Sequence, residues 1–466
     1  MRVKRSKACG RFEVAADGQG MTGRSGTALL AETADRIGLT AGLSRSVGGC
    51  RSWIAHDPGK VVRDLVVMLA DGGDALRHMK VLDGQPELFG DVASAATVNR
   101  TIVALANDEL GVERLGVARR RARARAWAAG AAPPVVAAAW RGERVDEPLC
   151  VDFDATLITA HADDKDGAAP TYKHGFGFHP LGSWLDRGDG TGEALAAMLR
   201  PGNAGSNTAE DHIDVFEAAL AQLPPLPPGV RLLARADTAG CTYDFLGYLR
   251  QAKVGFSVGY PIDADVRDAI RDIGDDAWTP ATCQDGDVRD GAHVAEITAD
   301  EHIDLTGYPK GARLIVRREP LHPGAQQTLD DVDGKRFTAF LTDQTEADLA
   351  LLDTRHRARA RVEDRIRGAK DTGARNLPCD TFERNAIWLQ LVLAAQDLMC
   401  FMQNLCLDGD LRVAEPQRLR YQILHVPARI VTTGRRVIMR IQHDWPWAQQ
   451  LLTAYARLRA IPLPAT

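Results

Sequence analysis

The sequence predicts an α/β protein: a mixed sheet with helices on its faces, interrupted by a β-rich insertion and preceded by a mainly helical N-terminal domain. Three observations lead to this fold class. Up to residue 130, apolar residues recur at helical spacing. Between residues 150 and 260, strand patterns alternate with helical ones, as in a sheet covered by helices. From residue 261 to about 344, strand patterns recur at 293–299, 313–319 and 336–342.

The composition is that of a globular protein with several domains. The chain has 466 residues, of which 45% are hydrophobic, and a mean hydropathy of −0.21. Its eight cysteines form no Cys-x2-Cys pair, which favours free thiols in a reducing compartment over a zinc module or a disulfide framework. The first 20 residues contain no apolar segment of the kind found in secretory signals.

Charge is distributed unevenly along the chain. Residues 1–150 contain 22 Lys and Arg against 17 Asp and Glu, and residues 346–466 contain 18 against 13. The middle of the chain therefore has a net charge of −15. Basic ends are suited to phosphates and an acidic middle to cations, although ordinary surface scatter is the alternative.

The N-terminal region is expected to contain helices at 27–37, 60–70, 74–82, 94–105 and 109–130. The fourth begins at a Ser and presents Arg100, as a helix-turn-helix unit would, although a plain helical bundle fits the spacing equally well. The fifth carries five arginines between residues 119 and 125. They indicate either a solvated helix or one that contacts phosphates through Arg119, Arg120 and Arg121.

Two carboxylates stand out in the strand predicted at 150–158. Asp152 and Asp154 share one face of this strand, and Phe153 lies on the other. Burying carboxylates is costly unless a partner compensates them, and a divalent cation would do so. The alternative is a strand end that faces water.

The strands and helices that follow bring another carboxylate, Asp237, to the sheet. We expect strands at 172–181, 193–199, 230–236 and 255–260, with helices at 208–223 and 242–251. Asp237 follows the strand at 230–236, at the carboxyl end where α/β sheets build sites.

The C-terminal third is expected to be helical, with one hairpin. A helix from residue 346 to 370 would carry four residues on one face, namely His356 and the residues 3, 7 and 14 positions after it, which are Arg359, Glu363 and Lys370. A long apolar helix at 382–407 is interrupted by polar residues and is expected in a core rather than in a bilayer. A hairpin at 428–441 and a helix at 447–460 end the chain.

Together these motifs resemble the DDE insertion-sequence transposases, in particular the cut-and-paste group with a Tyr-x2-Arg-x3-Glu-x6-Lys signature. Here His356 stands in the Tyr place, followed by Arg359, Glu363 and Lys370. The first-strand Asp-x-Thr matches Asp154 and Thr156, and the later Arg-x-Asp matches Arg235 and Asp237. The resemblance spans roughly residues 25–445.

The resemblance implies a division into domains. Residues 1–140 would form a mainly helical DNA-binding domain, and residues 148–260 with 346–410 a ribonuclease-H-like catalytic core. Residues 261–345 would form the β-rich insertion, and residues 411–466 a C-terminal hairpin and helix.

The resemblance also implies a function and its residues. Asp154, Asp237 and Glu363 would be catalytic and would hold two Mg²⁺ ions, for which Mn²⁺ would substitute. The enzyme would cut DNA at the ends of the element and transfer the 3′ ends to target DNA. Asp152 is the rival to Asp154 as first ligand, and we expect it to lie behind the metal site. The expected DNA contacts are His356, Arg359, Lys370, Arg100, Arg119, Arg120 and Arg121.

The expected partners are double-stranded DNA, as terminal inverted repeats and target, and a second copy of the chain in the synaptic complex. We expect no membrane association and a place in the bacterial cytoplasm, with the nucleoid. Two alternatives stay open: a ribonuclease-H-like nuclease without strand transfer, and an inactive domesticated DNA-binding protein.

Overall fold

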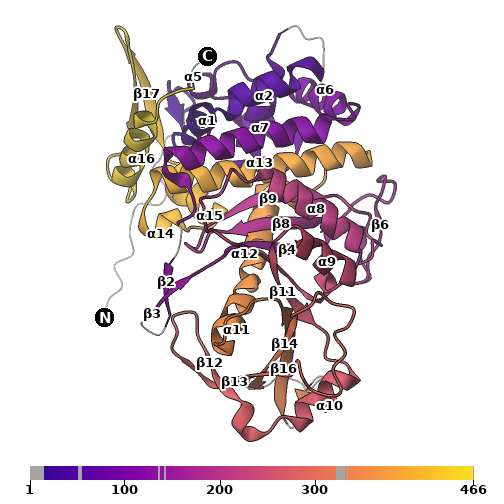
Figure 1. Ribbon diagram of the computed structural model, residues 1–466. Coiled ribbons are helices and arrows are strands. Elements are labelled where there is room, and N and C mark those ends of the chain that lie inside the picture. Colours follow the sequence, from indigo (N-terminus) through magenta and orange to yellow (C-terminus); the bar gives the residue numbers. More distant parts are fainter. Residues whose placement is uncertain are drawn as a thin grey trace, which may run out of the picture.

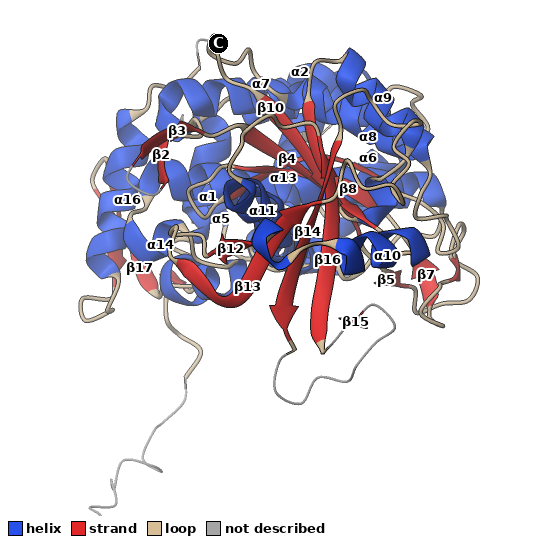
Figure 2. Ribbon diagram, turned by 60° about the horizontal axis from the view of Figure 1, so that its bottom comes forward, coloured by secondary structure: helices blue, strands red, loops and turns tan. Residues whose placement is uncertain are grey.

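The centre of the molecule is a mixed ten-stranded sheet that runs in the order β12-β13-β14-β16-β11-β10-β4-β8-β9, with β15 beside β16 (Figures 1 and 2). The computed structural model describes residues 15–50, 55–134, 137–140, 143–321, 331–332 and 334–464. Strands β4, β10 and β11 are parallel, and the other pairs of this sheet are antiparallel. This mixed sheet and its helices confirm the predicted α/β class.

The strands of the sheet are β4 (Leu149–Ala155), β8 (Leu181–Asp186), β9 (Gly192–Met198), β10 (Leu232–Ala236), β11 (Gly255–Tyr260), β12 (Thr279–Thr282), β13 (Val288–Glu296), β14 (Arg313–Pro320), β15 (Asp331–Val332) and β16 (Lys335–Thr342). The remaining strands form three small sheets. The first consists of β1 (Met21–Thr22), β17 (Ala428–Thr433) and β18 (Arg436–Ile441), and the second of β2 (Ala137–Trp140) and β3 (Glu143–Asp146). The third consists of β5 (Ile158–Thr159), β7 (Phe176–Phe178) and β6 (Ala169–Pro170).

Helices cover both faces of the sheet and form a thick layer beyond β9 (Figure 1). One face packs against α8 (Ala209–Gln222), α9 (Tyr243–Gln251) and α10 (Ala264–Asp272), and the other against α11 (Leu349–Arg357) and α12 (Arg361–Ala369). The helical layer contains α1 (Thr27–Arg36), α2 (Leu39–Val47), α3 (Pro58–Ala70), α4 (Lys80–Asp83), α5 (Pro86–Phe89), α6 (Ala95–Ala106), α7 (Gly111–Ala126), α13 (Phe382–Cys406) and α16 (Ala448–Ala460). Two short helices, α14 (Gly409–Arg412) and α15 (Pro416–Leu419), follow α13.

Most predicted elements are present, but the strand predicted at 172–181 is wrong. Only the short β7 forms there, and the longer strand is β8, which begins at Leu181. All six residues of β8 are buried between β4 and β9. A strand buried on both faces lacks the alternation of polar and apolar residues that makes a half-buried strand recognisable.

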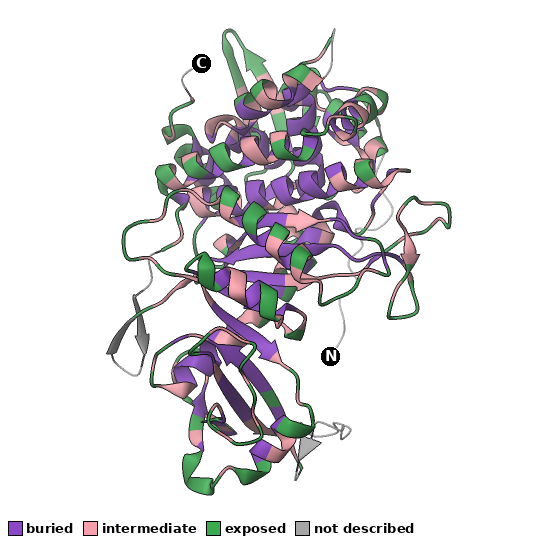
Figure 3. Ribbon diagram, turned by 45° about the vertical axis from the view of Figure 1, so that its right-hand side comes forward, coloured by how far each residue is buried: buried purple, intermediate pink, exposed green. Residues whose placement is uncertain are grey.

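The β-rich region between residues 261 and 345 extends the central sheet. Strand β16 pairs antiparallel with β11, and β14, β13 and β12 follow outward. Figure 3 shows this end of the molecule as a lobe with a buried interior and an exposed outer surface. Trp278 packs there against Phe337 and under Arg318, as expected of a residue in a local core. The division of the chain into domains stays a prediction.

Helix α13 joins the helical layer to the sheet. It packs against β9 on one side and against α3, α6 and α7 on others. Among the described residues it is the one helix long and apolar enough to cross a membrane, and 89% of that stretch is buried inside the molecule. This agrees with the expected core position.

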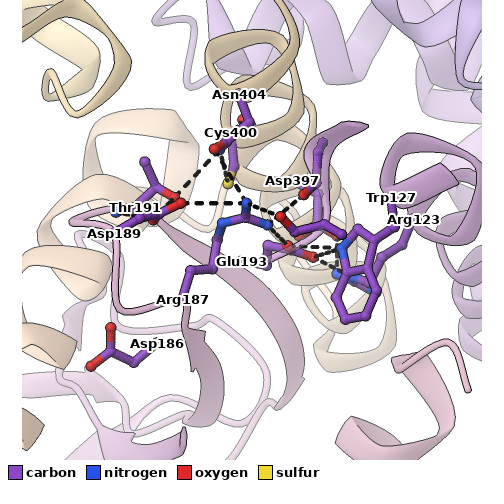
Figure 4. Close-up of polar contacts among 12 residues, drawn as sticks. Arg123, Trp127, Asp186, Arg187, Asp189, Thr191, Glu193, Asp397, Cys400 and Asn404 are labelled. Carbon is purple, nitrogen blue, oxygen red and sulfur yellow. Dashed lines mark hydrogen bonds and ion pairs between the residues drawn. The ribbon is translucent and has the colours of Figure 1, made fainter. Parts of the chain in front are cut away.

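A buried ionic network fixes this junction (Figure 4). Arg123 of α7 donates to Glu193 of β9 at 2.8 Å and to Asp397 of α13 at 2.7 Å. Asp397 also accepts from Arg119 at 2.9 Å and from the backbone N–H of Ala194 at 3.0 Å. Every charge in this group is at least 95% buried and has an opposite charge in contact, which is the condition for burying it.

The network corrects one prediction. Arg119 is 3% exposed and bound to Asp397, so the expected DNA contact by Arg119 is wrong. The cause is a carboxylate 278 residues away in sequence, which helical periodicity cannot reveal. Arg120 and Arg121 are exposed on the same helix, and their DNA contacts stay predictions.

Candidate active site

Two of the expected carboxylates lie side by side at the carboxyl ends of parallel strands. Strands β4 and β10 are in register at Asp152 and Arg235, so Asp154 and Asp237 each lie two residues further along. Asp154 is the last but one residue of β4, half-buried, and its Oδ1 accepts the N–H of Ala155. Asp237 caps the short turn that follows β10, accepting the N–H of Ala239 at 2.9 Å.

The third carboxylate reaches the same place from α12, which packs against β4 and β8. Glu363 lies in the first turn of α12 and is exposed. Among the described residues its side chain has no hydrogen-bond or ion-pair partner. Arg359, four residues earlier, places Nη1 3.7 Å from Oδ2 of Asp154. That Nη1 is buried and has no hydrogen-bond acceptor, so it remains free to donate.

Electrostatics show that the three carboxylates act on one another. Burial raises the pKa of the Asp154 carboxyl to about 6. The positive charge of Arg359 opposes this rise, whereas the carboxylates of Asp237 and Glu363 add to it. At Asp154 the charge of one guanidinium is therefore opposed by the charges of two carboxylates.

This donor set fits a divalent cation. Carboxylate oxygens are the ligands that Mg²⁺ and Mn²⁺ prefer, and a cation would stabilise the ionised form of Asp154, which burial and, to a smaller extent, the neighbouring carboxylates disfavour. Within the described part of the chain, only Asp272, Asp300 and His302 bring three ligand atoms within 4.8 Å of one another. That group lies on the surface of the β-rich lobe. The carboxylates of Asp154, Asp237 and Glu363 are more widely spaced.

Asp152, the expected rival to Asp154, is held in a different network. Arg235 donates to both of its carboxylate oxygens, at 2.6 and 2.8 Å, and also to Asp186 of β8 at 2.7 Å. Nη1 of Arg235 donates to the backbone carbonyl of Arg355, in α11. Arg361 of α12 approaches Asp186 at 3.1 Å. This network ties β4, β8 and β10 to α11 and α12, on either side of the short turn that carries Arg359.

The two aspartates of β4 should therefore respond differently to the same substitution. Asp152→Asn is expected to lower the free energy of unfolding by about 2 kcal/mol, because a buried, doubly bonded charge partner of Arg235 is lost. Asp154→Asn should not destabilise the fold, since its charge is unfavourably placed without a cation. Urea denaturation of the two variants measures the difference, and equal destabilisation would contradict these assignments.

His356 does not lie where the sequence predicted. The expected continuous helix at 346–370 is interrupted by a 3-10 turn, Ala358–Ala360, so His356 and Glu363 do not share a face. The imidazole stacks on Phe340 at 4.5 Å and its Nδ1 lies 3.0 Å from Ser257 Oγ. Burial, together with nearby arginines, lowers its pKa to about 3, so the ring is neutral at physiological pH. This placement does not support a phosphate contact by His356.

The low pKa of His356 predicts a pH effect on stability. Between about pH 3 and its unfolded value of 6.5, the unfolded chain binds a proton that the folded protein excludes, so stability falls as pH is lowered through this window. His356→Phe keeps a ring against Phe340 and removes the titration. We expect this variant to lose less stability than wild type between pH 6.5 and 4, as measured by urea denaturation. Parallel pH profiles would show that His356 is not held neutral.

Lys370 lies beyond the end of α12, half-buried, and a second lysine that the sequence did not single out accompanies it. Burial lowers the pKa of Lys370, and the charges of Arg375 and Lys173 lower it further. Lys173 is exposed between β6 and β7, next to His174, which has an unusual positive φ of 60°. No sequence motif marks Lys173, because its charge acts on Lys370 only in the folded chain.

Arg100 lies apart from this site, on the exposed face of α6. Ser94 caps that helix as predicted, accepting the N–H of Thr97. Arg100 donates to Thr97 Oγ1 at 2.9 Å and is otherwise open to solvent. Its expected contact with DNA stays a prediction.

Comparison with known families agrees with this geometry. The family model described as transposase DDE domain group 1 matches residues 5–463, nearly the whole chain. A search of curated protein sequences finds no match. The extent of the family match confirms the resemblance that the Asp, Asp and Glu motifs indicated. The chain belongs to the DDE transposase family, in the group of transposase DDE domains that this family model describes.

Proposed function

We propose that this protein is a DNA transposase that cuts DNA at the ends of its element and joins the freed 3′ ends to target DNA. The observation that carries the proposal is the meeting of Asp154, Asp237 and Glu363 beside Arg359, in a chain of the DDE transposase family. The carboxylates alone would also fit a nuclease, and the family favours strand transfer.

Asp154, Asp237 and Glu363 would hold two Mg²⁺ ions, with Mn²⁺ as a substitute. Such a pair stabilises the negative charge on the attacking and leaving oxygens of an in-line phosphoryl displacement. Asp154 must be ionised to act as a ligand, and its raised pKa means that it competes with protons up to about pH 6. Cleavage should therefore require more metal below this pH.

The cations around the carboxylates have a separate task. The Arg359 guanidinium lies next to Asp154 in a side chain that is partly exposed, and its exposed part would donate to an oxygen of the DNA backbone. Lys370 and Lys173 would hold phosphates further along the strand. By fixing the backbone, these side chains would set which phosphodiester bond lies over the carboxylates.

The finer architecture is also a proposal. A meander of β4, β8 and β9, with parallel strands β10 and β11 on the other side of β4, supports a ribonuclease-H-like core built from residues 148–260 and 346–410. The N-terminal helices would bind terminal repeats, and two copies of the chain would pair two element ends in a synaptic complex.

The test is a joining assay. The protein is incubated with Mg²⁺, a duplex that ends in the element's own terminal repeat and a supercoiled target plasmid. We expect nicks at the repeat boundary and covalent products that link the 3′ ends to the plasmid. Cleavage without joined products would favour the nuclease. Binding without cleavage in either Mg²⁺ or Mn²⁺ would favour the inactive DNA-binding protein.

A further inference from the structure

The C-terminal hairpin, β17 and β18, is a cationic ribbon that the catalytic account does not use. It stands at the edge of the helical layer, next to α16, and its strands turn at Gly434 and Arg435 (Figure 1). Residues 428–441 contain four arginines and no acidic residue, in a chain whose net charge is −5. All four arginines, Arg429, Arg435, Arg436 and Arg440, are exposed.

The register of the ribbon places most of this charge on one face. Arg429 lies directly opposite Arg440, and Thr433 lies opposite Arg436. Because side chains alternate along a strand, Arg429, Arg436 and Arg440 share a face. The other face carries Ile430, Met439 and Ile441, which line a hollow against α1 and α16 together with Ile438 from the arginine face. The apolar face is thus turned towards the protein and the cationic face away from it.

None of these four guanidinium groups has an ion-pair or hydrogen-bond partner within the described ranges. Elsewhere in the fold, arginines such as Arg123, Arg235 and Arg355 are each bound to carboxylates. The pair of Arg429 and Arg440 is unfavourable in the isolated protein, since like charges directly opposite one another repel. The repulsion between the two guanidinium groups is relieved when an anion lies across both strands.

Protection of a sheet edge does not explain the pattern. Charged side chains on an outer strand discourage pairing with other chains, and β18 is such a strand. Arg429, however, is on β17, the middle strand of this small sheet, where no edge is open.

We propose that the outer face of the β17–β18 ribbon binds the phosphate backbone of double-stranded DNA. Two-stranded ribbons are narrow enough to enter the major groove, and arginines on such a ribbon reach the flanking phosphates. This inference rests on the proposed function, in which DNA is the substrate, and adds a contact that the active-site residues do not provide. The ribbon would hold DNA without taking part in its cleavage.

The test compares Arg429→Gln/Arg440→Gln with a control that removes the same charge from paired arginines. Arg271→Gln/Arg289→Gln is suitable, because Arg271 is paired with Asp268 and Arg289 with Glu319. Binding of the terminal-repeat duplex is followed by fluorescence anisotropy over a range of salt. Thermal unfolding checks the fold, and the ribbon variant should unfold no earlier than wild type because a repulsive pair has been removed.

We expect the ribbon variant to bind at least about tenfold more weakly at low salt, with a salt slope shallower by about 0.9 for each lost phosphate contact. The control should bind as wild type does, and cleavage by the ribbon variant at saturating DNA should be unchanged. Wild-type affinity and salt slope in the ribbon variant would overturn the ribbon proposal alone. A change in oligomeric state without a change in DNA affinity would also overturn it, and would make the ribbon a contact between subunits. Failure of wild type to bind duplex DNA would overturn the proposed function as well.

Discussion

Glu363→Gln is expected to lower the rate of strand cleavage by at least about 1000-fold while leaving the fold and DNA binding intact. The side chain is exposed and, within the described ranges, makes no bond to the protein, so its loss removes only a ligand. Asp154→Asn and Asp237→Asn should have effects of the same size. In Asp237→Asn, the amide oxygen still accepts the N–H of Ala239, which preserves the local turn.

The matched control for Glu363→Gln is Asp364→Asn, the next residue of the same helical turn. Asp364 forms a surface ion pair with Arg367 at 2.9 Å, and such exposed pairs contribute less than about 1 kcal/mol. Cleavage by this control should stay within a few-fold of wild type. If Glu363→Gln cleaves as fast as Asp364→Asn, the third ligand has been assigned wrongly.

Asp397→Ala is expected to give the largest loss of stability, about 3–5 kcal/mol. The carboxylate neutralises Arg119 and Arg123 and accepts the N–H of Ala194, all in the buried junction between α7, α13 and β9. Removing it leaves Arg119 without a carboxylate partner and Arg123 with Glu193 as its one carboxylate partner. Urea denaturation followed by tryptophan fluorescence measures the change.

The control for Asp397→Ala is Asp408→Ala, which removes an exposed ion pair with Arg457. We expect a change below about 1 kcal/mol for this variant. A comparably small effect of Asp397→Ala would mean that the network in Figure 4 contributes little to holding the helical layer on the sheet.

The parts of the site that lie on strands could be predicted from the sequence. Asp154 lies near the end of one recognisable strand and Asp237 directly follows another, and the ends of parallel strands meet at one edge of a sheet. Their meeting therefore depends on local patterns and on one general rule of sheet topology. Glu363 required the family resemblance, because nothing in helical periodicity says which face of the sheet a helix will cover.

The errors about side-chain positions have one physical origin, which is a partner far away in sequence. Arg119 looked like a surface cation because Asp397, which neutralises it, lies on another helix. His356 looked like a neighbour of Glu363 because helical periodicity does not reveal the break at Ala358–Ala360, and its ring lies against Phe340 instead. Asp152 likewise has a distant partner, Arg235, which also binds Asp186, and both of these residues lie on strands adjacent to β4. Buried charges need partners, and the sequence does not say where those partners are.

The most direct test of the central claim is the binding of Mn²⁺, measured by isothermal titration calorimetry on the metal-free protein. The claim is that Asp154, Asp237 and Glu363 form one metal site, and it predicts that Asp154→Asn, Asp237→Asn and Glu363→Gln each lose the binding seen in wild type. Asp364→Asn and Asp272→Asn, the latter in the exposed group of the β-rich lobe, should bind as wild type does. Retained binding in the three carboxylate variants, or its loss in Asp272→Asn alone, would contradict the account.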